Sequence, residues 1–155
     1  MDDLSIARAL HVVGVVLWIG GVGMVTTVLL PVVKRDVASQ RHALFEAIEG
    51  RFARQARATT LLVGATGFYM TWEQGLWDRL LDSAFWWMHA MVGVWLVFTL
   101  MLFLIEPLWL HRWFAHAAAL RPERTFRTIV ILHWLLLGTS LITVAGAVVG
   151  SHGGF

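Results

Sequence analysis

The sequence contains no cysteine and few charged residues. Charged residues make up 14% of the 155 residues, hydrophobic residues make up 58%, and the mean hydropathy is +0.70. A soluble domain carries about 25% charged residues, so we expect lipid rather than water to surround most of this chain. The absence of cysteine also removes thiolate ligands, which leaves a metal inside the membrane short of donors other than histidine.

The apolar stretches lack the alternation that a β-barrel requires. Hydrophobic residues follow one another continuously, and unpaired strand edges cannot face lipid, so we exclude strands. A helix rises about 1.5 Å per residue and has to cross about 30 Å of hydrocarbon. The sequence predicts an all-α integral membrane four-helix bundle in one domain over residues 1–155, with helices at 6–33, 55–73, 84–113 and 125–150 and an interfacial amphipathic segment at 37–54.

Basic residues are concentrated in two of the three predicted connections. Of the 12 lysine and arginine residues, all but Arg8 and Arg79 lie in these two connections or within the first or last turn of a helix beside them. By the positive-inside rule these two connections face the cytoplasm, and both termini face the outer, periplasmic side. No basic region precedes the first apolar run, so we expect this run to be retained rather than cleaved as a signal peptide. The expected location is the bacterial inner membrane, with lipid as a partner and no nucleic acid bound.

Two of the seven histidines, His11 and His89, lie near the outer ends of predicted membrane helices. Each is about five residues inside its helix, or roughly 7 Å, so both imidazoles are expected at the same depth. Two facing imidazoles are the simplest way to give a haem iron two axial ligands inside a membrane. We therefore predict a haem b site, and bis-histidine ligation favours electron transfer because it leaves no open iron position.

Residues around the two histidines fit a flat macrocycle. A glycine follows each histidine at helical spacing, and glycine allows a porphyrin plane to approach the backbone. Arginines near the outer boundary can pair with propionates. The predicted cofactor-binding residues are His11, His89, Gly14, Trp18, Gly93, Arg8 and Arg79. The alternative is that each histidine hydrogen-bonds a neighbouring helix and the glycines only pack helices, in which case no chromophore binds.

A second group of ionisable residues lies toward the cytoplasmic side. Glu106 and His133 are expected at similar depth, and a buried carboxylate usually needs such a partner, as a structural hydrogen bond or as part of a proton path. His111 is a candidate to join His133 in a second metal or haem site. Near the outer side, Met88 and Met91 flank His89, and because thioether and imidazole together suit Cu(I), copper is the alternative cofactor.

Three segments carry a resemblance to a known group of membrane proteins. The run from Arg8 to Gly21, with its leucine-histidine pair followed by tryptophan and glycine, resembles the first helix of the superfamily that includes HemJ-type protoporphyrinogen oxidases and the copper-resistance CopD membrane domain. Leu61 to Phe68 and Trp86 to Met91 are similar to the same group. The resemblance implies a small four-helix haem b protein with His11 as an axial ligand. HemJ-type enzymes typically carry a lysine where this chain has Met91, which counts against porphyrinogen oxidation.

Together these features predict a haem b membrane cytochrome that passes electrons between a lipid-soluble or periplasmic donor and an acceptor. The alternatives are a HemJ-like protoporphyrinogen oxidase and a CopD-like copper-handling protein. The sequence identifies neither donor nor acceptor. A quinone, a periplasmic redox protein and a second copy of the chain are the partners to be considered.

Overall fold

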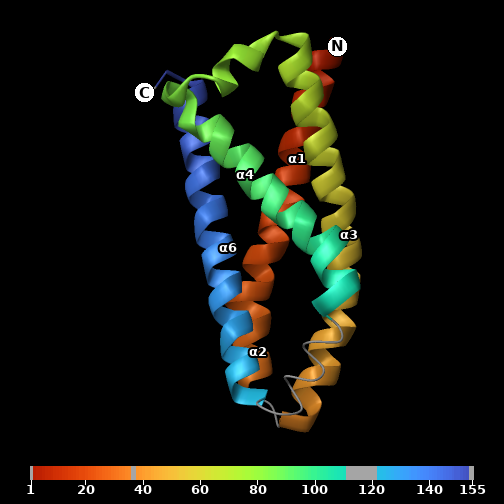
Figure 1. Ribbon diagram of the computed structural model, residues 1–155. Helices are drawn as coiled ribbons and strands as arrows, with labels where there is room; N and C mark the ends of the chain where they lie inside the picture. The colour runs from red at the N-terminus through yellow and green to blue at the C-terminus, as the bar shows by residue number, and fades with distance from the viewer. Residues whose placement is uncertain (1, 36–37, 111–121, 154–155) are drawn as a thin grey trace.

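The computed structural model describes residues 2–35, 38–110 and 122–153 of the chain. These residues form helices, and no strand occurs among them, so the all-α prediction is confirmed. Four helical rods make up the described part of the bundle, and the two chain ends lie at the same end of it (Figure 1). Among the described residues, three helices are long and apolar enough to cross a membrane: Asp3–Lys34, Ser83–Glu106 and Glu123–Ser151. The predicted membrane helix at 55–73 is not one of them.

The first rod is helical throughout but changes its hydrogen-bond pattern near its lower end. It consists of α1 (Asp3–Met24), a π-helix (Val25–Leu29) and α2 (Leu30–Arg35). Asp2 caps the first turn, since its Oδ1 accepts a hydrogen bond from the Ser5 N–H at 2.7 Å. Hydrogen bonding from Ser5 also holds the pKa of Asp2 below its ordinary value. The π-helix lies just before Pro31, which has no N–H to continue the regular pattern.

The second rod is a single helix, α3 (Ala38–Glu73). We predicted an interfacial segment at 37–54 and a separate membrane helix at 55–73, but residues 38–73 are continuous, and residue 37 lies outside the described residues. The only glycine or proline in residues 38–54 is Gly50, and one glycine costs about 1 kcal/mol. The helix therefore continues through the segment that we had separated.

The second half of the chain begins with a short cap over the upper end of the bundle. Its elements are η2 (Leu76–Leu80), η3 (Ser83–Phe85), α4 (Trp86–Leu100), the π-helix η4 (Met101–Leu110) and α6 (Pro122–Ser151). α4 crosses the bundle obliquely, from α6 at its upper end toward α3 at its lower end (Figure 1). The predicted helix at 84–113 is helical as far as residue 110, and residues 111–113 lie outside the described part.

The core lies where all four rods meet. Trp18 and Val22 of α1 pack in one buried cluster with Val63 of α3, Phe98 of α4 and Leu137 of α6. The Trp18 and Phe98 rings meet edge to face with centroids 4.8 Å apart, a favourable aromatic geometry. A second buried cluster lies lower on the first rod and packs against the start of α6. Large apolar side chains on the outer faces of α4 and α6 are exposed, as expected of surfaces that face lipid.

Several glycines allow aromatic rings from neighbouring helices to pack directly against the helix backbone. A Cβ atom at Gly64 would lie 2.7 Å from the ring of Trp95, and one at Gly150 would lie 2.5 Å from the ring of Trp87. Trp86 packs on Gly146 in the same way. These glycines therefore serve helix packing, and the tryptophans fix α4 against α3 and α6.

We expect the substitution Gly64→Ala to destabilise the protein by about 1–3 kcal/mol, because the added methyl group displaces Trp95 and overpacks the α3–α4 contact. Unfolding of the detergent-solubilised protein in increasing denaturant measures the effect. The matched control is Gly20→Ala, because a Cβ at Gly20 meets nothing within 4 Å. Equal stability of the two variants would contradict this description of the α3–α4 contact.

Candidate functional site

His11 is half-buried and its ring is held by α3. Its Nδ1 lies 3.1 Å from the Val63 carbonyl oxygen and 3.0 Å from the Thr66 hydroxyl oxygen. A carbonyl can only accept, and the Thr66 hydroxyl already donates to the Leu62 carbonyl at 2.7 Å. Both neighbours of Nδ1 are therefore acceptors, and the proton of a neutral His11 ring resides on Nδ1.

This tautomer leaves a lone pair on Nε2 of His11. No hydrogen bond to Nε2 is found among the residues that the structure describes. A metal-binding histidine typically has this arrangement, in which one ring nitrogen donates to a carbonyl and the other is free to ligate. Gly67 allows it, because a Cβ there would lie 3.3 Å from Cε1 of His11. The ring is thus oriented before any ligand binds.

Gly14 and Trp18, which we predicted to bind the cofactor together with His11, lie in contacts between helices. A Cβ at Gly14 would meet Val63 of α3 at 2.8 Å, so this glycine brings α1 and α3 together. Trp18 is 3% exposed and packs against Phe98. Both positions are occupied by packing between helices, so the space below His11 is filled by protein on the α3 side.

His89 has a different environment from His11. It is exposed, its Nε2 lies 2.9 Å from the Leu80 carbonyl oxygen, and its Nδ1 lies 3.1 Å from the Phe85 carbonyl oxygen. Both neighbours are acceptors, so a neutral ring can donate to only one of them, and each ring nitrogen lies against a carbonyl oxygen rather than facing open space. The ring instead ties the cap formed by η2 and η3 to the start of α4.

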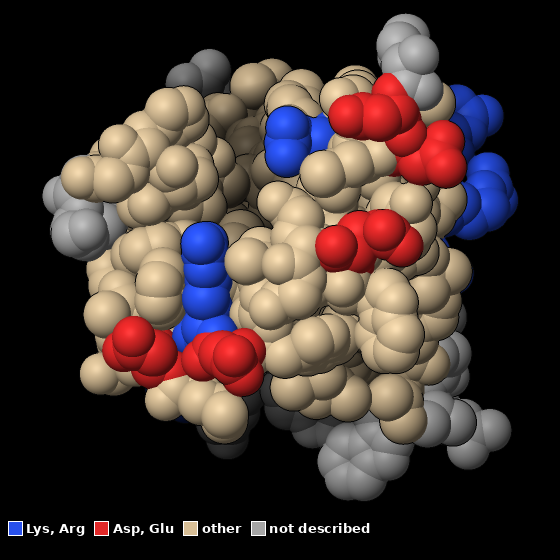
Figure 2. All heavy atoms as spheres, turned by 90° about the horizontal axis from the view of Figure 1, so that it is seen from above, with Lys and Arg blue, Asp and Glu red and all other residues tan. Residues whose placement is uncertain are grey.

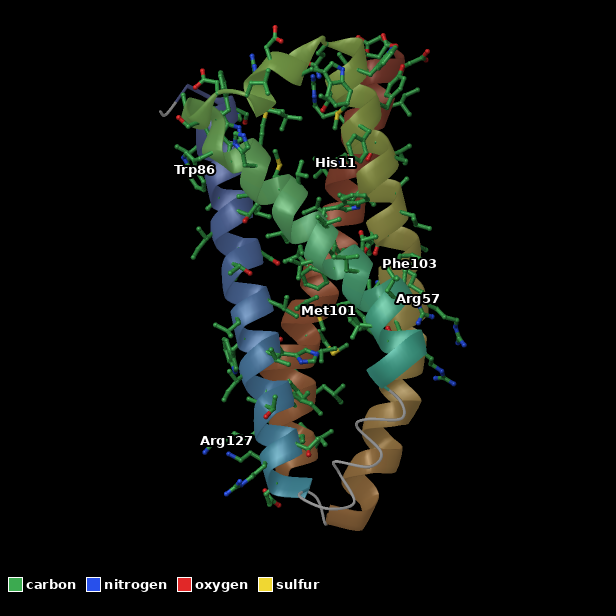
Figure 3. All side chains as sticks on the ribbon, viewed as in Figure 1. His11, Arg57, Trp86, Met101, Phe103 and Arg127 are labelled. Carbon is green, nitrogen blue, oxygen red and sulfur yellow. The ribbon has the colours of Figure 1, made fainter. Side chains whose placement is uncertain are left out.

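The structure also separates the helix ends that carry the two histidines. Figure 3 shows His11 on the side of α1 and α3, whereas Trp86, three residues before His89, lies on the side of α6. Trp86 and Trp87 are seated on glycines of α6, which directs the upper end of α4 away from α1. The two helices meet lower down, at Trp18 and Phe98.

None of the remaining predicted residues of the outer site is fully buried. Gly93 is exposed, and a Cβ there would meet nothing within 4 Å. The guanidinium of Arg79 lies 4.8 Å from the centre of the Phe85 ring, a cation–π contact. Arg8 is exposed, and Met88 and Met91 are half-buried.

The end of the bundle that carries the two termini has charges of both signs. Figure 2 looks onto this end and shows acidic and basic residues spread over a mostly uncharged face. The elements at this end contribute Asp2, Asp3, Arg8, Glu73, Asp78, Arg79 and Asp82. The opposite end is basic, with Lys34 on α2, Arg51 and Arg54 on α3 and Arg124 and Arg127 on α6.

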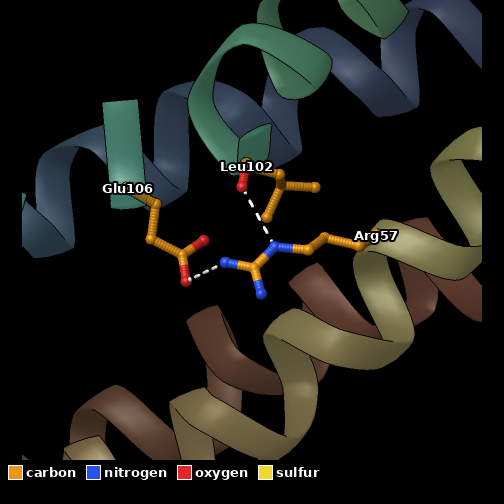
Figure 4. Close-up of polar contacts among 3 residues, drawn as sticks. All are labelled: Arg57, Leu102 and Glu106. Atoms are coloured by element: carbon orange, nitrogen blue, oxygen red, sulfur yellow. Dashed lines mark hydrogen bonds and ion pairs between the residues drawn. The ribbon is translucent and has the colours of Figure 1, made fainter. Parts of the chain in front are cut away.

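An ion pair that we did not predict joins α3 to the lower part of the α4 rod (Figure 4). The Arg57 Nη2 lies 2.8 Å from Oε1 of Glu106, and the Arg57 Nε donates to the Leu102 carbonyl at 3.0 Å. In a π-helix each carbonyl accepts from the N–H five residues later, and for Leu102 that residue is Pro107, which has no N–H. Arg57 therefore supplies the donor that the proline lacks.

This contact replaces the one we expected for Glu106. We paired Glu106 with His133, but Glu106 binds Arg57, and Nδ1 of His133 lies 2.9 Å from the Ile129 carbonyl of its own helix. His133 is half-buried on α6, and no hydrogen bond to its Nε2 is found in the part of the chain that the structure describes. His111 lies outside the described residues.

Within the described residues, no group of three or more histidine, aspartate or glutamate side chains could hold a metal ion. A bis-histidine haem site has only two protein ligands and does not require such a group. No protein-family model, no curated protein and no solved structure matches this chain.

Proposed function

We propose that this protein is a haem b protein of the bacterial inner membrane that transfers electrons, with His11 as an axial ligand of the iron. When bound, haem supplies one-electron redox chemistry. The observation that carries the proposal is the orientation of His11: Val63 and Thr66 hold Nδ1, and Nε2 keeps its lone pair.

The imidazole of His11 is a suitable ligand for haem iron. Neutral imidazole is a common haem ligand, and hydrogen bonding of the opposite nitrogen to a carbonyl raises its basicity. Arg8 is exposed at the same end of α1, where it can meet an anionic propionate. The basic end of the bundle, opposite the termini, favours an orientation with the termini in the periplasm.

In this proposal His89 is the second ligand, and it has to change its contacts. Its Nε2 must leave the Leu80 carbonyl before it can donate a lone pair to iron. That release frees the cap from the start of α4, since His89 contacts both Leu80 and Phe85. Ligand binding and movement of the cap are therefore coupled at this residue.

The test is an absorption spectrum of the detergent-purified protein, oxidised and dithionite-reduced, with haem and protein quantified on the same sample. We expect a b-type spectrum with close to one haem per chain. In His89→Ala we expect haem to remain but the spectrum to change from six-coordinate to five-coordinate, because only His11 is pre-oriented. A colourless protein from cells well supplied with haem would overturn the proposal, and copper bound to that protein would favour the CopD-like alternative.

A further inference from the structure

Two buried polar atoms in the core have no hydrogen-bond partner among the described residues. They are Nε1 of Trp18 on α1 and Oγ1 of Thr60 on α3. Trp18 is 3% exposed and Thr60 is fully buried. An unpaired polar group in an apolar environment costs about 1–3 kcal/mol, so two such atoms in one core call for a partner.

Thr60 differs from the other threonines of the membrane-embedded helices. Thr26, Thr66, Thr99 and Thr143 each donate their hydroxyl to the carbonyl four residues earlier, a bond open to any helical threonine. For Thr60 that acceptor is the Ala56 carbonyl, which the Thr59 hydroxyl already approaches at 3.2 Å. The Thr60 hydroxyl makes no such bond and has no partner among the described residues, so it is available to a group from outside its own helix.

Trp18 and Thr60 lie in the same part of the bundle. α1 and α3 are antiparallel, and Trp18 packs in one buried cluster with Val63, three residues after Thr60 on α3. α4 contacts both residues. Its Trp95 donates from Nε1 to the Thr60 carbonyl at 2.9 Å, and its Phe98, one turn later, packs against Trp18.

We propose that Trp18 and Thr60 together bind one internal water molecule where α1, α3 and α4 meet. The indole N–H donates to the water oxygen, and the Thr60 hydroxyl accepts from the water or donates to it. Buried waters in proteins bind polar groups that lack other partners, and water is small enough for a closely packed junction. The site lies between the His11–Thr66 contact above and the Arg57–Glu106 pair below. It does not rest on the proposed haem function.

NMR of protein labelled with 15N at the indole nitrogens tests this site. The signal of Trp18 is identified by its absence in Trp18→Phe. We expect a cross-peak between the Trp18 indole proton and a long-lived water, retained in Thr60→Ser and lost in Thr60→Val. Thr60→Val should also raise the equilibrium constant for unfolding about tenfold, since the water loses a partner.

Thr143→Val is the matched control, because Thr143 is also buried, at 7% exposure, but donates within its own helix. We expect this variant to keep the cross-peak of Trp18. The absence of a water cross-peak from the wild-type Trp18 indole would overturn the proposal, and this result does not depend on whether the Thr60 variants fold. A Thr60→Val variant more stable than the wild type would overturn it as well, because that result is expected when the hydroxyl has no partner to lose.

Discussion

The substitution His11→Ala is expected to remove most of the bound haem from the purified protein while the helical content stays unchanged. His11 is the only one of the two predicted ligands whose Nε2 lone pair is available, because Val63 and Thr66 occupy Nδ1. The side chain is half-buried, so its loss leaves a space next to Gly67 but does not disrupt a packed core residue. The haem-to-protein ratio and the far-ultraviolet circular dichroism spectrum measure the two effects.

A graded effect should follow from the residue that orients the ring. Thr66→Val removes one of the two acceptors of Nδ1 and should weaken haem binding about tenfold, as expected for a group that holds a metal ligand in place. Thr71→Val is the control, because Thr71 lies on the same helix and donates to the Gly67 carbonyl rather than contacting His11. A normal haem content in His11→Ala would remove the basis of the proposed function, whereas a Thr66→Val protein identical to wild type would remove only the orienting role.

The depth of His11 could be predicted from the sequence, but the orientation of its ring could not. The length of the apolar run and the helical rise placed it about five residues, or roughly 7 Å, inside the first predicted helix. Its contacts depend on the register between α1 and α3, which brings Val63 and Thr66 opposite His11 over more than fifty residues of sequence. The glycine at position 67 is the one local signal, because it permits the close approach of the ring.

His89 shows the limit of an argument from depth alone. Equal depth does not fix the direction in which a helix leans or the face that a residue occupies. Trp86 packs on Gly146 and Trp87 packs on Gly150, and these contacts hold the upper end of α4 against α6. All four residues stand in the sequence, but no sequence pattern pairs these tryptophans with these glycines.

The basic stretch before residue 58 misled the prediction in a similar way. Arg51, Arg54 and Arg57 lower the hydropathy of that stretch, so we divided it into an interfacial segment and a membrane helix that begins at residue 55. The spacing of three residues is also a helical spacing, and α3 continues through it. The predicted helix at 55–73 already contained Arg57, but the sequence did not show that this residue faces Glu106.

The substitution Arg57→Ala is expected to destabilise the protein by about 2–3 kcal/mol, more than Glu106→Ala. Arg57→Ala leaves two acceptors without a donor: the Glu106 carboxylate, whose side chain is 16% exposed, and the Leu102 carbonyl. Removing one partner of a fully buried pair costs about 3–5 kcal/mol, and the 33% exposure of Arg57 reduces that value here. Denaturant unfolding in detergent measures the difference.

The order of the two effects follows from the geometry of the contact. In Glu106→Ala the guanidinium keeps the Leu102 carbonyl through Nε, and its exposed part can reach water, so we expect a loss of about 1 kcal/mol. The double variant should be no less stable than Arg57→Ala, because the carboxylate that lacked a donor is then absent. Arg54→Ala, an exposed arginine one turn away on α3, should change stability by less than about 0.5 kcal/mol. If Glu106→Ala proved the more damaging change, the Leu102 carbonyl would not depend on Arg57, and the link between Pro107 and this ion pair would have to be abandoned.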